Sequence, residues 1–273
     1  MVNDQFPEWA GESINPVAQS GWDNRTFHLG DTMSVRLPSA SRYAAQVPKE
    51  QKWLPHLANF LPLPIPQPIA LGQPSKHYPY CWSIMSWLQG QPANNSNLAD
   101  SAKIAEQLAH FLNALRATPA DNGPIAGKHN FYRGGDLRIY DQEVRHALDQ
   151  LGDDIDGPAI LELWAKACNS EWNEPPVWLH GDVAAGNFLT DGDALAAVID
   201  FGNLGAGDPA CDLTVTWTYL TGNARAVFRR TIGLDDATWT RAKGWGLWKA
   251  LLDVCAGKPA AHDVLNAILS DPS

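Results

Sequence analysis

The segment at positions 178–202, WLHGDVAAGNFLTDGDALAAVIDFG, constrains the fold more than any other part of the chain. The short apolar runs WLH, NFL and AAVID predict strands, and Asp191-Gly192-Asp193 predicts the turn between the last two of them. Side chains that carry oxygen stand at the ends of these strands, namely Asp182, Asn187 and Asp200. We therefore expect the strands to hold three oxygen donors at one end of a cleft.

Residues 1–90 are predicted to be mostly β. Positions 17–37 have the spacing of strand, loop, strand, turn and strand, with Gly30-Asp31 as a two-residue hairpin turn. Apolar residues at helical spacing predict one main helix over 42–60. The segment LPLPIPQP that follows cannot be helical, because proline recurs at every second position, and it favours an extended connection. The apolar run CWSIMSWLQG at 81–90 predicts a last strand and a hinge.

Residues 91–273 are predicted to be mostly helical. Apolar residues recur at three and four positions from Leu98 to Leu115, and the same spacing returns over 137–151. Pro158 is placed to open a further helix. The chain is therefore expected to have an α+β fold of two lobes, with a small β-rich N-lobe at 1–90 and a larger, mostly helical C-lobe at 91–273.

The charge of the chain is unevenly distributed. It carries 20 basic and 30 acidic residues, and the net charge of −10 argues against a nucleic-acid partner. Residues 1–90 hold six of the basic and six of the acidic residues, so the whole acidic surplus lies in 91–273. Two explanations stay open, which are a solvated acidic surface and a field that attracts a cationic small molecule.

Other features favour a cytoplasmic protein without a membrane partner. No apolar run approaches the roughly 20 residues that a membrane span needs, and the amino terminus lacks the pattern of a secretion signal. The four cysteines are widely spaced and form no Cys-x-x-Cys, so we expect reduced thiols. The composition is compatible with a monomer or a dimer.

The motif within 178–202 resembles that of a known family. His180-Gly181-Asp182, the asparagine five positions after that aspartate, and Asp-Phe-Gly at 200–202 resemble the aminoglycoside phosphotransferases. That family has His-Gly-Asp where protein kinases have His-Arg-Asp. The resemblance extends from about Ile14 to about Leu220. It implies a protein-kinase-like fold, ATP or GTP as co-substrate, Mg²⁺, and phosphoryl transfer to a hydroxyl of a small molecule.

The resemblance suggests a role for each polar residue of this region. Phosphoryl transfer needs in-line positioning, neutralised phosphate charge and a group that takes the hydroxyl proton. Asp182 is expected to be that base, while Asn187 and Asp200 supply the hard oxygen ligands that Mg²⁺ prefers. His180 is expected to hold backbone in the loop, and Asp212 to brace the loop by accepting backbone hydrogen bonds.

The nucleotide side carries weaker signals. Gly21 lies in the first loop, but a complete Gly-x-Gly-x-x-Gly is absent. Arg36 on the third strand occupies the place where kinases usually have a lysine, so it is expected to contact phosphates, although a surface arginine is the alternative. Its partner would be Glu50, the only acidic residue in that part of the chain. A base pocket would use the hinge backbone near Met85 and Trp87.

The acceptor is expected to contact the late helices. Asp253 and Asp263 are candidate contacts and Trp245 and Trp248 candidate stacking faces, although solvated surface and core packing explain them as well. An aminoglycoside-type antibiotic, cationic, is the leading expectation. A kinase of an intracellular metabolite (homoserine, choline, methylthioribose or a fructosamine) is the second. A nucleotide-binding module without catalysis is the third, and it is disfavoured because all three catalytic oxygen donors are present.

Overall fold

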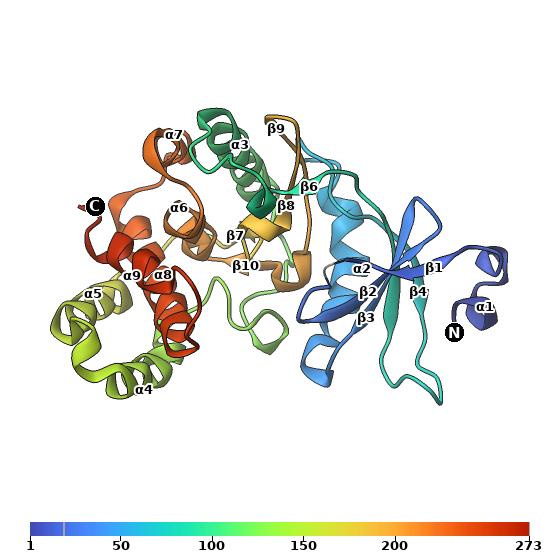
Figure 1. Cartoon of the computed structure of the whole chain (residues 1–273), viewed down its shortest axis with the longest axis horizontal. Helices are drawn as coiled ribbons and strands as arrows, with labels where there is room; N and C mark the ends of the chain where they lie inside the picture. The colour runs from blue at the N-terminus through green and yellow to red at the C-terminus, as the bar shows by residue number, and fades with distance from the viewer. Residues whose placement is uncertain (19, 273) are drawn as a thin grey trace.

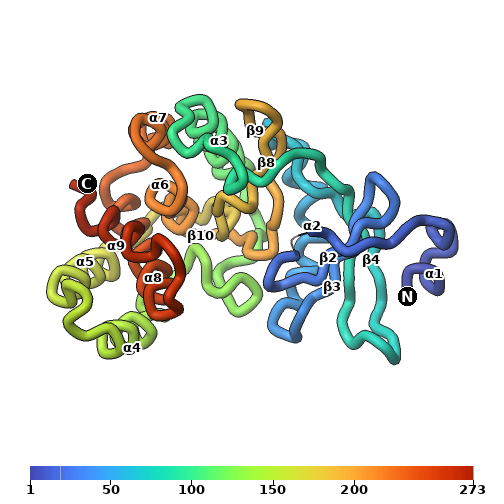
Figure 2. Tube along the Cα trace, viewed as in Figure 1, coloured from blue at the N-terminus to red at the C-terminus, as the bar shows by residue number. Residues whose placement is uncertain are grey.

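The protein, described for residues 1–18 and 20–272 by a computed structural model, has two lobes (Figure 1). A twisted sheet with one long helix forms the N-lobe, at the right of Figure 1, and helices dominate the C-lobe, at the left. The two chain termini lie at opposite ends of the molecule (Figure 2). The expected α+β, two-lobed arrangement is thereby confirmed. Within the described residues, no helix is long and apolar enough to cross a membrane.

The N-lobe is built on an antiparallel sheet that has five strands within the described residues, in the order β1-β2-β3-β5-β4. These strands are β1 (Ile14–Pro16), β2 (Asn24–Leu29), β3 (Met33–Pro38), β4 (Pro68–Gly72) and β5 (Trp82–Ser86). Leu29, Val35, Ile84 and Trp82 form a buried core with Val2 of the short helix α1 (Val2–Gln5). Because side chains alternate along a strand, a slip of one residue would expose this core, so burial defines the register.

The turn between β2 and β3 differs from the predicted two-residue hairpin. Leu29 pairs with Met33, so three residues, 30–32, form the loop. Gly30 takes a left-handed conformation with φ of 60°, which glycine adopts at little cost. The carbonyl of Thr32, the last residue of this loop, accepts a hydrogen bond from the hinge amide of Trp87 at 2.8 Å. The loop thus contacts the hinge.

Helix α2 (Gln46–Leu57) connects the sheet to the C-lobe. It is the main helix expected over 42–60, but a 3-10 turn at Ser41–Tyr43 precedes it, and Pro55 lies within its last turn. It packs against β4 and β5 on one side and against the 3-10 turn η8 (Phe201–Asn203) on the other. Since η8 directly follows Asp200, α2 contacts the Asp-Phe-Gly segment.

The C-lobe contains the predicted helices and short strands. Its helices are α3 (Ala102–Ala117), α4 (Asp141–Leu151), α5 (Gly157–Asn169), α6 (Val215–Thr218), α7 (Gly222–Ile232), α8 (Asp236–Cys255) and α9 (Ala261–Leu269). Its strands are β6 (Gln91–Pro92), β7 (Val177–Leu179), β8 (Phe188–Asp191), β9 (Ala194–Val198) and β10 (Gly205–Gly207). β6, β8 and β9 form one small antiparallel sheet, and β7 pairs with β10. The exact division of the lobes at residue 90 stays a prediction.

Helix α8 runs through the centre of the C-lobe and is buried along most of its length. Its glycines allow close approach of neighbours, because a Cβ at Gly244 would lie 2.6 Å from the Cβ of Ala167 and one at Gly246 3.0 Å from Ile268. The side chains of Trp239 and Trp245 are fully buried, so α8 supplies much of the interior that a tryptophan-rich chain requires. This packing determines which α8 side chains reach the catalytic loop.

Candidate functional site

Short strands bring the predicted oxygen donors together. Asp182 follows β7, Asn187 immediately precedes β8, and Asp200 follows β9. β8 and β9 are antiparallel, with Phe188 opposite Val198, so the start of β8 and the end of β9 lie side by side. Asn187 and Asp200 are therefore positioned at the same end of the hairpin, as the sequence predicts.

Two backbone positions near these residues have left-handed conformations. Gly181 has φ of 83° and Asp200 has φ of 65°. A Cβ at Gly181 would lie 2.3 Å from the carbonyl oxygen of Asn203, so the position excludes side chains by space as well as by φ. This contact explains why the motif has glycine between His180 and Asp182.

Asp212 and His180 hold the backbone of the loop that carries Asp182. The buried Asp212 carboxylate accepts hydrogen bonds from the amides of His180 (2.8 Å) and Gly181 (2.7 Å). His180 Nδ1 accepts from the amide of Asp182 (3.2 Å), which leaves Nε2 to donate to the carbonyl of Ile199 (3.0 Å). Burial raises the pKa of Asp212, and His180 and the two amides oppose that rise. These are the contacts expected of a brace, while their part in turnover stays a prediction.

The Asp182 carboxylate lies between an amide and an ammonium group. Asn187 Nδ2 donates to the Asp182 carbonyl (2.9 Å) and lies 3.4 Å from Oδ2. Lys249 Nζ lies 3.4 Å from Oδ1. Burial alone would raise the pKa of Asp182, but the charges of Lys249 and Arg133 outweigh burial and lower it. Asp182 is therefore ionised at neutral pH, as a proton acceptor must be.

Arg36 joins the two lobes through ion pairs. Its Nη1 donates to Glu50 Oε1 at 3.0 Å, and its Nη2 donates to Asp200 Oδ1 at 3.3 Å. Burial disfavours the charge of Arg36, but Glu50, Asp200 and Asp23 outweigh it and raise the pKa. Burial and the Asp23 carboxylate raise the pKa of Asp200 above its usual range, against the pull of Arg36. The centre thus holds more negative charge than Arg36 neutralises, which suits a bound cation.

Lys49 makes a second connection between the lobes. Its Nζ donates to the carbonyls of Gly202 (2.7 Å) and His129 (3.2 Å), and it lies 3.2 Å from His129 Nδ1. Burial lowers the pKa of Lys49 to about 7, against the attraction of the neighbouring Glu50. Helix α2 is therefore tied to the turn that follows Asp200 by a buried amine as well as by the Arg36 pairs.

A cavity of about 490 Å³ lies between the lobes. Predicted residues of both lobes line it, namely Gly21, Arg36, Met85, Trp87, Asn187 and Asp200. Glu50 is absent from its lining and is reached through Arg36. The hinge amides of Ser86 and Trp87 already donate to the carbonyls of Gln67 and Thr32, at 2.8 Å each. These two amides are therefore not free to bind a ligand.

A small hollow opens beside Asp182 in the C-lobe. Its lining brings together Arg133, Gly181, Asp182, Cys211, Thr214, Trp245, Trp248 and Lys249. The two predicted stacking residues, Trp245 and Trp248, are mostly buried, and the Arg133 guanidinium covers their faces at 5.2 and 4.7 Å. The same two tryptophans therefore pack in the core and line the hollow.

The two predicted acceptor aspartates lie apart from this hollow. Asp253 is one helical turn beyond Lys249 on α8 and is paired with Lys258 at 2.6 Å. Asp263 is exposed on α9. Neither lines the hollow or the inter-lobe cavity, so their role as acceptor contacts stays a prediction without geometric support.

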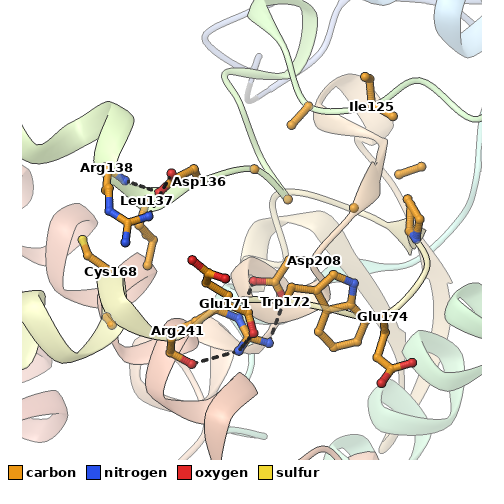
Figure 3. A pocket seen from close by; sticks show the side chains of 18 residues that line it. Ile125, Asp136, Leu137, Arg138, Cys168, Glu171, Trp172, Glu174, Asp208 and Arg241 are labelled. Carbon is orange, nitrogen blue, oxygen red and sulfur yellow. Dashed lines mark hydrogen bonds and ion pairs between the residues drawn. The ribbon is translucent and has the colours of Figure 1, made fainter.

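A further cavity of about 500 Å³ lies elsewhere in the C-lobe (Figure 3). In its wall, buried Arg241 donates to Asp208 at 2.7 Å, and Figure 3 shows Trp172 beside this pair. Asp208 also accepts from the amide of Ala210 (3.1 Å) and so caps the 3-10 helix at Pro209–Thr214. Neither Asp182 nor Asp200 is among the residues that line this cavity. Its volume is similar to that of the inter-lobe cavity, so the predicted catalytic residues, and not size, distinguish the candidate site.

The fold and the site together define a class of protein. A β-rich lobe presents an arginine paired with a helix glutamate, and a helical lobe presents a loop with Asp and Asn followed by Asp-Phe-Gly. This combination is that of a kinase-like phosphotransferase. A sequence profile described as "Phosphotransferase enzyme family" matches residues 14–245, most of the chain. The chain belongs to this phosphotransferase family.

Solved structures and curated proteins add named relatives. The GDP complex of wild-type aminoglycoside 2'-phosphotransferase-IIIa is 19% identical, with a TM-score of 0.72 over 99% of this chain and 96% of that one. Aminoglycoside phosphotransferase APH(4)-Ia, in a ternary complex with AMP-PNP and hygromycin B, is 18% identical, with a TM-score of 0.66 over 100% and 98%. At these identities the structures confirm the protein-kinase-like fold alone.

A curated protein matches part of the chain. Hygromycin-B 4-O-kinase of Escherichia coli is 26% identical over 159 residues, which are 54% of this chain and 45% of that protein. The match thus spans less than half the length of this relative.

Three charged residues at the site were not predicted from the sequence. Lys49 precedes Glu50 at the start of a helix, where a lysine is usually solvated, so nothing marks it as buried. Arg133 lies in the loop between α3 and α4, which has no motif. Lys249 follows Trp245 by four positions, and this spacing places both on one face of α8. That spacing is the only local signal that could have drawn attention to Lys249.

Proposed function

We propose that the protein is an O-phosphotransferase that moves the γ-phosphoryl group of ATP or GTP to a hydroxyl of a small cationic molecule of the aminoglycoside type. The convergence of Arg36, Glu50 and Asp200 with the loop that carries Asp182 and Asn187 supports this proposal most strongly. A fixed cation for the phosphates and an ionised carboxylate for the hydroxyl proton are the groups that phosphoryl transfer requires.

The nucleotide is proposed to occupy the inter-lobe cavity of about 490 Å³, a volume that suits a small ligand. Its base would lie against the hinge near Met85 and Trp87. Because the amides of Ser86 and Trp87 donate within the N-lobe, the hinge offers the base carbonyl oxygens and the amide of Leu88. One solved relative holds GDP and another AMP-PNP, so both nucleotide types belong in the test.

Asn187 and Asp200 fit a Mg²⁺ ion by their chemistry. Both offer hard oxygen atoms, and Asn187 donates Nδ2 to the Asp182 carbonyl, which leaves its Oδ1 for another partner. Burial, together with the Asp23 carboxylate nearby, raises the pKa of Asp200. Within the described residues no three His, Cys, Asp or Glu side chains form a metal cluster, which agrees with an ion held mainly by phosphate and water. When bound, Mg²⁺ would neutralise charge on the phosphates.

The protein's own groups would carry the remaining chemistry. The acceptor oxygen attacks the γ-phosphorus, its proton passes to Asp182, and the bond to the bridging oxygen of the β-phosphate breaks. The products are a nucleoside diphosphate and a phosphate monoester. Arg36 holds the phosphates, while His180 and Asp212 keep the loop in place through backbone hydrogen bonds. The proposed roles therefore use every contact of the predicted motif.

A cationic acceptor is supported by the acidic surplus of the C-lobe and by the aminoglycosides that the relatives bind. The hollow at Asp182 is itself lined by Arg133 and Lys249, so the ammonium groups of the acceptor would lie beyond it. Glu143 accepts a hydrogen bond from Nε1 of Trp248, one of the residues that line the hollow, at 2.9 Å. We propose Glu143 as an additional contact for such an ammonium group.

The proposal is tested by coupled release of ADP or GDP against a panel of aminoglycosides, macrolides, amino sugars and amino alcohols. Acceptor-dependent release is expected in the wild type and is expected to disappear in Asp182→Ala and Asp200→Ala. Asp193→Ala is the matched control, since Asp193 is 78% exposed in the β8–β9 turn and pairs only with surface Lys103. Wild-type turnover in either catalytic variant would overturn the proposed mechanism.

Expression in a sensitive host separates the acceptor classes. An antibiotic kinase should raise tolerance to the drug that it phosphorylates. A kinase of an intracellular metabolite should phosphorylate homoserine, choline, methylthioribose or a fructosamine without raising tolerance. Nucleotide binding without transfer to any acceptor would instead support the non-catalytic module.

A further inference from the structure

The hollow beside Asp182 has the opposite charge balance to the lobe that contains it. Among the described residues that line it, two are cations, Arg133 and Lys249, and one is an anion, Asp182. Cys211, which also lines the hollow, stays a neutral thiol, because burial and nearby Asp212 raise its pKa well above the usual value. Since the C-lobe carries the whole acidic surplus of the chain, two cations in one small hollow require an explanation.

The protein holds the Arg133 side chain in place but leaves one of its hydrogen-bond donors without a partner among the described residues. Its Nε donates to the carbonyl of Gly181 at 3.1 Å, and its guanidinium carbon lies over the rings of Trp245 and Trp248 at 5.2 and 4.7 Å from their centroids. Its Nη1 is buried, yet it has no hydrogen-bond partner among the described residues. A buried guanidinium donor without an acceptor is unfavourable, so this group is suited to a ligand that brings its own oxygen atoms.

Lys249 is only partly satisfied by the protein. Its contact to Asp182 Oδ1 is 3.4 Å, longer than the roughly 2.7–2.9 Å of a strong charge-assisted hydrogen bond. The side chain is 39% exposed, and an ammonium group has three donors. Lys249 can therefore accept a second anionic partner without leaving Asp182.

We propose that Arg133 and Lys249 form a binding site for the phosphoryl group on the acceptor side of Asp182. The inference rests on the proposed function. If Asp182 takes the acceptor proton, it contacts the acceptor oxygen, and the new bond to phosphorus forms at that same oxygen. The phosphoryl group would therefore pass next to the Asp182 carboxylate, which Lys249 faces, and close to Arg133, which lines the same hollow.

The two cations would act during and after transfer. While the bond to the leaving oxygen breaks and the bond to the acceptor oxygen forms, negative charge is spread over the three other phosphoryl oxygens. Fixed donors aimed at those oxygens stabilise this charge without reorganisation. After transfer, the same donors would hold the phosphate monoester until the product leaves. Arg36 serves the nucleotide phosphates, and Arg133 with Lys249 serves the transferred group.

The test uses ADP, Mg²⁺ and aluminium fluoride, which mimics a phosphoryl group in transfer, and it needs no identified acceptor. ADP with Mg²⁺ should raise the thermal midpoint of the wild type, and aluminium fluoride should raise it further. In Lys249→Met and Arg133→Met the apparent affinity for aluminium fluoride should fall at least about tenfold, since each removes a hydrogen bond to a charged group. The affinity for ADP alone should stay close to that of the wild type.

Two further variants make the result interpretable. Lys249→Arg should recover most of the aluminium fluoride effect, because it restores the charge. Lys258→Met removes a lysine that pairs with Asp253 outside the hollow, and it should behave as the wild type. Full aluminium fluoride affinity in Lys249→Met and Arg133→Met would overturn the phosphoryl site and leave the proposed function standing. A wild type that binds neither ADP nor GDP would overturn the proposed function itself.

Discussion

The nucleotide side and the acceptor side of the catalytic centre are built in different ways. On the nucleotide side, Arg36, Glu50 and Asp200 stand on or next to regular elements and pair with each other at 3.0 and 3.3 Å. On the proposed acceptor side, Arg133 comes from a loop and donates to the carbonyl of Gly181, and Lys249 comes from a buried helix and pairs with Asp182. The difference indicates that sequence motifs mark the residues of the nucleotide side, whereas no motif marks the charged residues of the acceptor side.

The largest expected effect concerns the residue that the two sides share. Asp182→Asn keeps the shape of the side chain but removes the proton acceptor, so kcat should fall by about 100-fold to 10,000-fold. The KM for nucleotide should change little, because Asp182 does not line the inter-lobe cavity. Steady-state kinetics with the best acceptor of the panel measure both quantities.

Asp191→Asn is the control for that prediction. Asp191 lies exposed at the end of β8 and should tolerate the change without loss of turnover. A kcat for Asp182→Asn within a few-fold of the wild type would show that another group takes the proton.

A smaller effect is expected on the nucleotide side alone. Arg36→Met removes the phosphate contact and leaves the Glu50 and Asp200 carboxylates unpaired, so nucleotide affinity should fall roughly 10-fold to 100-fold. Calorimetry with ADP and Mg²⁺ measures this change. Arg25→Met, an exposed arginine on the neighbouring strand β2, should leave affinity unchanged. Equal affinities for ADP in the wild type, Arg36→Met and Arg25→Met would show that Arg36 has a structural role and does not contact the phosphates.

The Lys49 contact between the lobes predicts a pH dependence of stability. The folded-state pKa is about 7, below the ordinary value of 10.5, so between these values the unfolded chain holds a proton that the folded protein has released. Stability from this group therefore rises with pH across that window, and it is lowest below about pH 7. Relative to Lys49→Met, the wild type should gain about 2 kcal/mol of unfolding free energy between pH 7 and pH 9.

Chemical denaturation at the two pH values measures that gain. Lys52→Met, which changes an exposed lysine on the same helix, should show no pH-dependent difference from the wild type. The free energy of unfolding of the wild type, relative to Lys49→Met, could instead stay constant or fall between pH 7 and pH 9. That result would contradict a buried amine at position 49.

The smallest effect concerns a predicted acceptor contact. Asp263 is exposed on α9 and lines neither the cavity nor the hollow, so Asp263→Asn should change stability by less than about 0.5 kcal/mol. It should also leave acceptor kinetics unchanged. Glu143→Gln, which changes the carboxylate bonded to Trp248, should instead raise the KM of a cationic acceptor. A raised KM in Asp263→Asn alone would place the acceptor on α9 and away from the hollow.

Much of the nucleotide side could be predicted because recognisable motifs mark its residues. The turn at 191–193 predicts the β8–β9 hairpin, and that hairpin places Asn187 and Asp200 at the same end. Glu50 could be chosen as the partner of Arg36 because no other acidic residue was near. The hairpin loop at Gly30 was predicted one residue too short, and its third residue, Thr32, bonds to the distant hinge.

The acceptor side could not be predicted because no motif marks Arg133 or Lys249, whereas a family motif or strand position marks Arg36 and Asp200, which are 164 positions apart. Lys249 and Asp182 are 67 positions apart, and Arg133 and Gly181 are 48 apart. The glycines of α8 determine how deeply that helix packs, and this packing decides that Lys249 faces the catalytic loop. The predicted aspartates, Asp253 and Asp263, were chosen by charge alone, and charge carries no information on which helix face meets the site.

The most direct test of the account follows the γ-phosphate itself by phosphorus NMR. With ATP or GTP, Mg²⁺ and an acceptor from the panel, the wild type should convert the γ-phosphate resonance into a phosphate monoester in step with nucleoside diphosphate. Asp182→Asn should form that ester at a rate lower by about 100-fold or more. An unchanged rate in Asp182→Asn, or no ester with any acceptor and either nucleotide, would contradict phosphoryl transfer at this centre.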